Sequence, residues 1–257
     1  MLPASLMQLG AWIDGFILVF LRISALLVAA PFFGANTITV RIRIVFAALI
    51  SALILPSLPP LDGFELVSAP GILAAVQQIF LGVAMGFIVQ MVFSGLIIAG
   101  QVMAMTMGLG FATALDPQNG VQVTVVSQFY VIISTLLFLA LDLHLYLIGY
   151  LASSFDLLPI TGAPIRPESF ILVAGWATHM FTGALLFAMP VLAAILLINV
   201  AFGVMTRAAP QLNIFSVGFP ITIAAGFVFM MFTFPSLLPV LNRFFEQAFE
   251  AMNLLLS

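Results

Sequence analysis

One stretch of the chain, from Leu66 to Leu115, contains no charged residue and no histidine. A single crossing of a bilayer needs about 20 apolar residues, so this stretch is longer than one crossing requires and too apolar for a water-exposed domain. It nevertheless contains glutamines and glycines, among them Gln77, Gln90, Gln101 and Gly95. Because lipid offers amide side chains no partner, we expect other protein to pack against this stretch. The chain is therefore predicted to be a membrane or membrane-complex protein.

Three further charge-free stretches run from Pro117 to Leu141, from Ser169 to Thr206 and from Ala208 to Asn242. Each is long enough for one or two membrane helices at about 20 residues per span. With 64% hydrophobic and 6% charged residues, the chain is predicted to be all-α with about six long apolar helices. We expect them near residues 11–30, 41–56, 71–107, 121–141, 174–202 and 214–238. No basic region precedes the first apolar run, so we expect no cleavable signal peptide.

The polar residues are too few and too scattered for several classes of function. All six basic residues are arginines and the formal net charge is -3, which gives no basic face for a nucleic acid. There is no cysteine for a disulfide or a thiolate metal site. The two histidines, His144 and His179, lack a credible set of nearby metal ligands, and no nucleotide-binding or hydrolase motif is present. We therefore expect no metal, no cofactor and no catalytic residues.

The arginines also give a poor signal for membrane orientation. If the helices alternate in direction, Arg41, Arg43 and Arg207 fall on one side and Arg166 and Arg243 on the other, which is close to no bias. We infer that partner subunits determine the final placement of the helices.

The first predicted helix carries Asp14 and Arg22, eight residues apart and close to one helix face. Two structural interpretations are favoured over a role in transport. The side chains extend to the membrane surface, or they form a pair that is satisfied inside the protein.

The third predicted helix carries a face of small and amide residues. Gln78, Gly82, Gly86 and Gly100 fall within an arc of about 80°. Gly82 and Gly86 form a small-xxx-small pair, which lets another backbone approach closely. Whether that neighbour is a helix of the same chain or of another subunit is left open.

A flexible apolar loop is predicted after this helix. The segment from Met103 to Ala112 contains three methionines, two close glycines and Phe111, and a polar turn follows at Asp116 to Gly120. Thioether side chains are unbranched and glycine has loose backbone limits, so such a loop could act as a gasket. Methionines in apolar segments more often fill a core, and both interpretations stay open on this observation.

A more specific pattern lies between Arg207 and Pro220. This segment closely resembles the signature of the FliR family of flagellar biosynthetic proteins, through Pro210, Gln211, Asn213, Phe215, Gly218, Phe219 and Pro220. The resemblance continues through Pro31 to Gly34 with Arg41 and Arg43, through Gly100 to Ala112 with Asp116 and Pro117, and through His144 with Ser154 and Phe155. It departs from many members of the family at Gln101 and Thr106, where an acidic residue and a glutamine are common.

The resemblance implies a non-enzymatic subunit of the flagellar type III export gate in the bacterial inner membrane, at the flagellar basal body and partly above the bilayer on the periplasmic side. It implies a FliP-like helical part over residues 1–170, with a plug loop near 105–120, and a FliQ-like helical hairpin with a C-terminal tail over 171–257. The implied partners are FliP and FliQ subunits in a ring, FlhB and FlhA, unfolded export substrates and membrane lipid. The loop of the family plugs the closed pore, which here assigns that role to Met105, Met107, Gly108, Gly110 and Phe111.

Three alternatives are kept. The equivalent subunit of a virulence injectisome would carry the same resemblance. A small-solute transporter should show paired ionisable groups near the middle of the membrane or matched broken helices in two repeated halves. An intramembrane enzyme should show a nucleophile and base or a metal cluster within its helices. Neither of the last two patterns is clear in this sequence.

Overall fold

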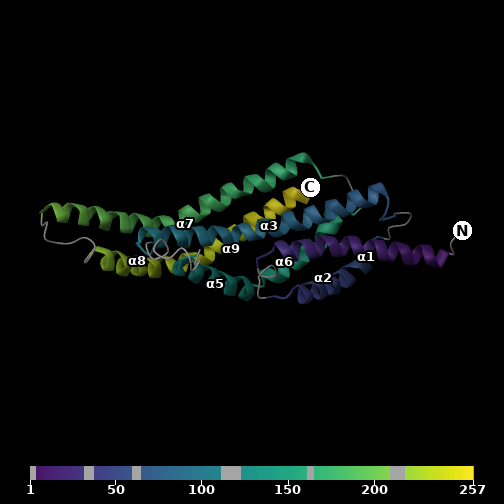
Figure 1. The fold of residues 1–257 in the computed structure, drawn as a ribbon, viewed down its shortest axis with the longest axis horizontal. Helices are drawn as coiled ribbons and strands as arrows, with labels where there is room; N and C mark the ends of the chain where they lie inside the picture. The colour runs from purple at the N-terminus through teal and green to yellow at the C-terminus, as the bar shows by residue number, and fades with distance from the viewer. Residues whose placement is uncertain are drawn as a thin grey trace. The chain divides into compact units, whose positions relative to one another are not determined.

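The structure, a computed structural model, describes residues 4–31, 38–59, 65–110, 123–160, 165–208 and 218–256 (Figure 1). Within these ranges every regular element is a helix, which confirms the predicted all-α class. Five of these helices are long and apolar enough to cross a membrane, or up to six if one bent pair is counted as a span. This agrees with the expected number of about six.

Two helices near the N-terminus, α1 (Ala4–Ala29) and α2 (Val40–Ile54), pack against one another (Figure 1). α1 buries Leu18 and Leu26 together with Arg22, because residues four apart lie on one helix face. A short 3-10 helix, η1 (Leu55–Ser57), follows α2. Its Pro56 has no backbone N–H to continue the α-helical ladder, and so α2 ends there.

The long helix α3 (Ala69–Thr106) confirms the expected third helix as one unbroken element. Its buried residues recur every three or four positions, as the core face of a helix requires. They include Leu81, Met85, Ile88, Val92, Leu96, Ala99 and Met103. In the most apolar part of α3, 67% of the residues are buried inside the chain, against 22% in the corresponding part of α2. α3 is therefore a core helix more than a lipid-facing one.

A bent pair of helices, α5 (Val125–Ala140) and α6 (Leu143–Leu157), follows. Thr124 caps α5, since its hydroxyl accepts a hydrogen bond from Ser127 N at 3.3 Å. At Asp142 the backbone is left-handed, with φ of 54°, a conformation that aspartate tolerates better than most residues. Asp142 lies in the break between the two helices. α6 was not among the expected ranges, because polar residues such as Ser153 and Asp156 interrupt its apolar pattern.

The helix α7 (Pro167–Ala208) is longer than the expected 174–202. Pro167 suits the first helical position, where no N–H partner is needed. Glu168 in the first turn and Arg207 in the last have the charges that a helix dipole favours at those ends. Pro190 lies inside the helix.

The chain ends with α8 (Phe219–Thr233), the 3-10 turn η3 (Phe234–Ser236) and α9 (Leu237–Leu256). The expected helix at 214–238 therefore corresponds to α8 and η3, and α9 is a further helix that was not among the expected ranges. Residues 214–217 lie outside the described ranges.

The helices form two compact units that alternate along the sequence. The first contains Met1–Met91, Asp142–Trp176 and Ala248–Ser257, and the second contains Val92–Leu141 and Ala177–Gln247. Aromatic contacts mark each core: the ring centroids of Phe80 and Phe170 are 4.2 Å apart in the first unit, and those of Phe138 and Phe245 are 5.1 Å apart in the second. The expected division near residue 170 stays a prediction.

Candidate functional site

The methionine- and glycine-rich segment begins inside α3. Met105 belongs to the last turn of α3 and is exposed, whereas Met107 is fully buried. Gly108 has a φ of +87°, which L residues rarely adopt, and it marks the end of the helix. Gly110 is partly exposed. The central residue of the expected plug, Phe111, lies outside the described residues.

The small-residue face of α3 packs within the chain. A Cβ atom on Gly82 would meet the backbone oxygen of Arg22 and lie 2.7 Å from Ala25 Cβ, and one on Gly86 would lie 2.6 Å from Ala29 Cβ. Both glycines therefore let α1 approach the α3 backbone. The sequence left open whether the neighbour of this face is a helix of the same chain or of another subunit. In the structure the neighbour is α1 of the same chain.

Gly100, further along α3, has a different neighbour. A Cβ atom there would lie 2.6 Å from Ser127 Cα, in the first turn of α5. The Ser127 hydroxyl donates a hydrogen bond to Ile97 O at 2.8 Å. Gly100 therefore permits a close contact of α3 with α5 in the second unit.

A buried polar cluster surrounds Arg22 in the first unit. Arg22 has 0% of its surface exposed, as has Gln78. Its Nε donates to Gln78 Oε1 at 2.7 Å, and its Nη1 donates to Ser154 O at 2.9 Å and to Ser154 Oγ at 3.1 Å. Its Nη2 donates to Leu158 O at 3.0 Å, and the ring centroid of Phe155 lies 4.1 Å from its Cζ. One arginine thus links α1, α3 and the end of α6.

The acceptors of Arg22 are all uncharged oxygens. Ser154 O and Leu158 O lie at the C-terminal end of α6, where the helix dipole gives a partial negative charge. The face of the Phe155 ring is also electron-rich and attracts a cation. These groups stabilise a guanidinium that water does not reach.

Arg22 is therefore satisfied inside the protein, as one of the two structural interpretations expected, but its expected partner was wrong. Asp14 Oδ2 instead accepts a hydrogen bond from Leu66 N at 3.4 Å. The sequence signals that did exist at the true site are Gln78, on the small-residue face, and Ser154 with Phe155 in the family resemblance. Nothing in the sequence joins them to Arg22.

The described part of the family signature begins α8. Gly218 is buried at the N-cap position, and Phe219 and Pro220 form the first turn. Pro210, Gln211, Asn213 and Phe215 lie outside the described residues.

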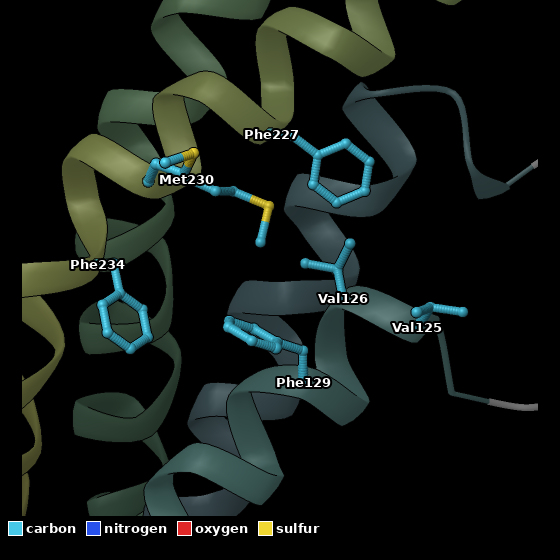
Figure 2. A pocket seen from close by; sticks show the side chains of 7 residues that line it. Val125, Val126, Phe129, Phe227, Met230 and Phe234 are labelled. Carbon is cyan, nitrogen blue, oxygen red and sulfur yellow. The ribbon is translucent and has the colours of Figure 1, made fainter.

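An apolar cavity of about 450 Å³ opens between α5 and α8 in the second unit (Figure 2). Its lining residues are Val125, Val126, Phe129, Phe227, Met230, Met231 and Phe234. In Figure 2 the rings of Phe129 and Phe227 and the thioether of Met230 face the cavity. The side chains that line it carry no group for acid-base or nucleophilic chemistry, and the cavity suits only apolar contents.

We next consider metal-binding and catalytic groups among the described residues. No group of three or more His, Asp or Glu side chains there is arranged to hold a metal ion. A second cavity, of about 340 Å³ between α7 and α9, is lined by His179, Arg243, Gln247 and mostly small or apolar residues. Its lining also includes the hydroxyl residues Thr182 and Ser236.

Comparison with protein families gives one match over most of the chain. Residues 13–248 match the family of bacterial export proteins, family 1. The matched range includes the Arg22 cluster, the glycine face of α3 and the whole of α8.

Several characterised proteins are similar over nearly their full length. The flagellar biosynthetic protein FliR of Pectobacterium carotovorum is 38% identical over 94% of this chain and 92% of its own length. The protein of the same name in Escherichia coli K12 is 33% identical over 100% of this chain and 98% of its own. That of Bacillus subtilis is 30% identical over 94% of both chains.

Proposed function

The chain belongs to the FliR family of bacterial export proteins, and from this premise we propose that it is a non-enzymatic subunit of the flagellar type III protein export gate. In this proposal it forms, with FliP and FliQ subunits, the channel through which unfolded flagellar subunits are exported. The similar proteins named above all carry a flagellar name, which favours the flagellar system over an injectisome.

The observation that carries an assembly function is the exposed apolar surface of α7. Its 42 residues make a helix about 63 Å long at a rise of about 1.5 Å per residue. Large apolar side chains are exposed near its start, at Ile171, and near its end, at Val204. The hydrocarbon core of a bilayer is only about 30 Å thick, so lipid alone covers no more than part of this surface unless the helix lies strongly tilted. Neighbouring protein subunits are the natural cover for the remainder.

In this proposal the chain has a FliP-like part over residues 1–170 and a FliQ-like hairpin over 171–257. Each part replaces a copy of the corresponding subunit in a helical ring in the inner membrane, partly above the bilayer on the periplasmic side. FlhB and FlhA are the further partners. Energy for export comes from those other components, because no nucleotide site was recognised in the sequence.

The loop near residues 105–120 closes the resting pore. A seal against ions needs apolar bulk, which Phe111 and the exposed Met105 supply. It also needs backbone freedom to move aside for a passing polypeptide, which Gly110, beyond the end of α3, supplies. The exposed Met105 and the left-handed Gly108 are compatible with a segment that leaves the α3 axis at this point.

We test the plug by deleting residues 111–119, which leaves the described end of α3 unchanged. The complex with FliP and FliQ is expected to assemble and to leak ions and small dyes. Phe111→Ala, which removes the largest apolar group, is expected to leak less than the deletion. Dye uptake and single-channel conductance are measured beside a pull-down of the FliP and FliQ subunits.

Two results would contradict parts of this proposal. An assembled complex that stays tight after the deletion would exclude the plug and leave the subunit role standing. A chain that does not co-purify with FliP and FliQ from the same operon would exclude the subunit role itself.

A further inference from the structure

The end of α3 is fixed by its own hydrogen bonds. Leu109 N donates to Ala104 O at 2.9 Å, and Gly108 N donates to Met105 O at 3.0 Å. This pair of bonds around a left-handed glycine is the Schellman motif, which ends a helix at one defined residue. The chain therefore leaves α3 at Gly108 in a set direction.

The first two turns of α8 cover this helix end. A Cβ atom on Gly108 would lie 2.7 Å from Phe219 Cζ, so the ring of Phe219 lies directly over the glycine. The Thr222 hydroxyl is within 3.4 Å of Met107 O. A Cβ atom on Gly226 would lie 2.5 Å from Met107 Cγ. The three α8 residues fall on one helix face, at spacings of three and four.

This contact is dry and closely fitted. Met107 has 0% of its surface exposed, and Thr222 has 6%. Gly108 and Gly226 both occupy positions where a methyl group would collide with the partner helix. The partners are more than 100 residues apart in sequence, since the Thr222 hydroxyl and Met107 O are separated by 115 residues. Such a contact resists movement of the last turn of α3.

We propose that Phe219, Thr222 and Gly226 form a clamp that holds the end of α3 in one position whether the pore is closed or exporting. Movement during export then begins after Gly108, and α3 itself stays in place. The three residues are positioning residues, because they act through the end of α3 that they contact. The inference rests on the proposed pore-closing function of the segment that follows.

One residue of the clamp, Phe219, also belongs to the family signature. Phe219 is the first residue of α8, directly after the N-cap Gly218. The resemblance placed Phe219 in the signature between Arg207 and Pro220 and gave it no contact. In the structure it is the residue that covers Gly108.

The first test removes the ring, with Phe219→Ala in the complex with FliP and FliQ. We expect assembly to be retained and dye uptake to rise above wild type, but to stay below that of the 111–119 deletion. Phe227→Ala is the matched control, because Phe227 lies on the same helix and faces the apolar cavity (Figure 2). The control should not raise dye uptake. An assembled Phe219→Ala complex as tight as the control would overturn the clamp.

The second test uses a disulfide, since the chain has no cysteine of its own. A Cβ atom on Gly226 would lie close to Met107 Cγ, so Met107→Cys with Gly226→Cys places two thiols within bonding reach. Under oxidation we expect the cross-link to form while the complex remains tight and continues to export at an unchanged rate. Export that stops on oxidation and resumes on reduction would show that the end of α3 must move, which would overturn the clamp even if Phe219→Ala fails to assemble.

The 111–119 deletion distinguishes a failure of the proposed plug from a failure of the proposed clamp. If the deletion itself does not leak, the proposed plug is wrong, whatever the clamp variants do. If the deletion leaks while Phe219→Ala stays tight, or while the cross-link stops export, the plug stands and only the clamp is wrong.

Discussion

At Arg22 a guanidinium, which water solvates strongly, lies where no water reaches it. Its charge is offset by neutral oxygens, two of them at the C-terminal end of α6, and by the Phe155 ring. Gln78 is oriented by the same contact, because Oε1 must face the Arg22 donor. Its Nε2 has no hydrogen-bond acceptor among the described residues. The cluster thus joins α1, α3 and the end of α6. If the arginine is removed, Gln78 Oε1 and Leu158 O lose this donor, whereas Ser154 O keeps the Leu158 N–H.

Replacing Arg22 by Met is expected to destabilise the assembled protein by about 3 kcal/mol, because the four hydrogen bonds that Arg22 donates would be lost. Arg22→Lys should restore little of the lost stability, because the single ammonium of lysine does not reproduce the planar set of N–H donors of the guanidinium. The melting temperature of the detergent-solubilised complex measures both. Arg41→Met, at an exposed arginine in the first turn of α2, is the control. Equal melting temperatures for Arg22→Met and the control would show that the cluster contributes nothing.

At the scale of elements, glycines set how closely helices approach. α3 meets α1 through Gly82 and Gly86 and meets α5 through Gly100, in each case where a Cβ would collide with the neighbour. A glycine inside a helix is about 1 kcal/mol less favourable for helix formation than an alanine. At these positions the glycine permits a close contact between helices. Gly149 in α6 differs, because a Cβ atom there would meet no other helix of the described ranges within 4 Å.

Gly82→Leu and Gly86→Leu are each expected to lower the yield of assembled complex and to destabilise it by about 1–3 kcal/mol through overpacking. Gly149→Leu is the control and should be neutral or slightly stabilising, because leucine favours the helix. Yield after detergent extraction and the melting temperature are compared across the three variants. Normal assembly of both α3 variants would mean that α1 can move away from α3 without cost.

At the scale of the whole molecule, apolar side chains remain exposed on many described helices. In the most apolar parts of α2, α7 and the α8–α9 segment only 22% of residues are buried inside the chain. α3 differs, since it is mostly covered by its own chain. Contiguous apolar surface on this scale marks contact with lipid or with other subunits.

The isolated chain is therefore expected to aggregate in detergent and to become monodisperse only when it is co-expressed with FliP and FliQ subunits. Size-exclusion chromatography with light scattering distinguishes the two states. A monodisperse monomer whose behaviour does not change on co-expression would count against assembly as the source of its stability.

Several features of this protein were determined by local sequence alone. Long charge-free runs predicted an all-α membrane protein, because hydropathy is a property of neighbouring residues. The turn at Gly108 and the end of α2 at Pro56 follow from the backbone limits of glycine and proline. α6 was missed because its polar residues interrupt the apolar pattern, although Ser154 is buried against Arg22.

Only the tertiary structure decided which residues meet. The acceptors of Arg22 are 56, 132 and 136 residues away, and the partner of Gly108 is Phe219 on another helix. Sequence pattern indicated that Gly82 and Gly86 lie in a close contact but not that the neighbour is α1. Local preferences fix where a helix runs and which face is small or polar. The partner of that face depends on how the whole chain packs, because a buried donor can be satisfied by any acceptor that long-range packing brings within hydrogen-bond distance.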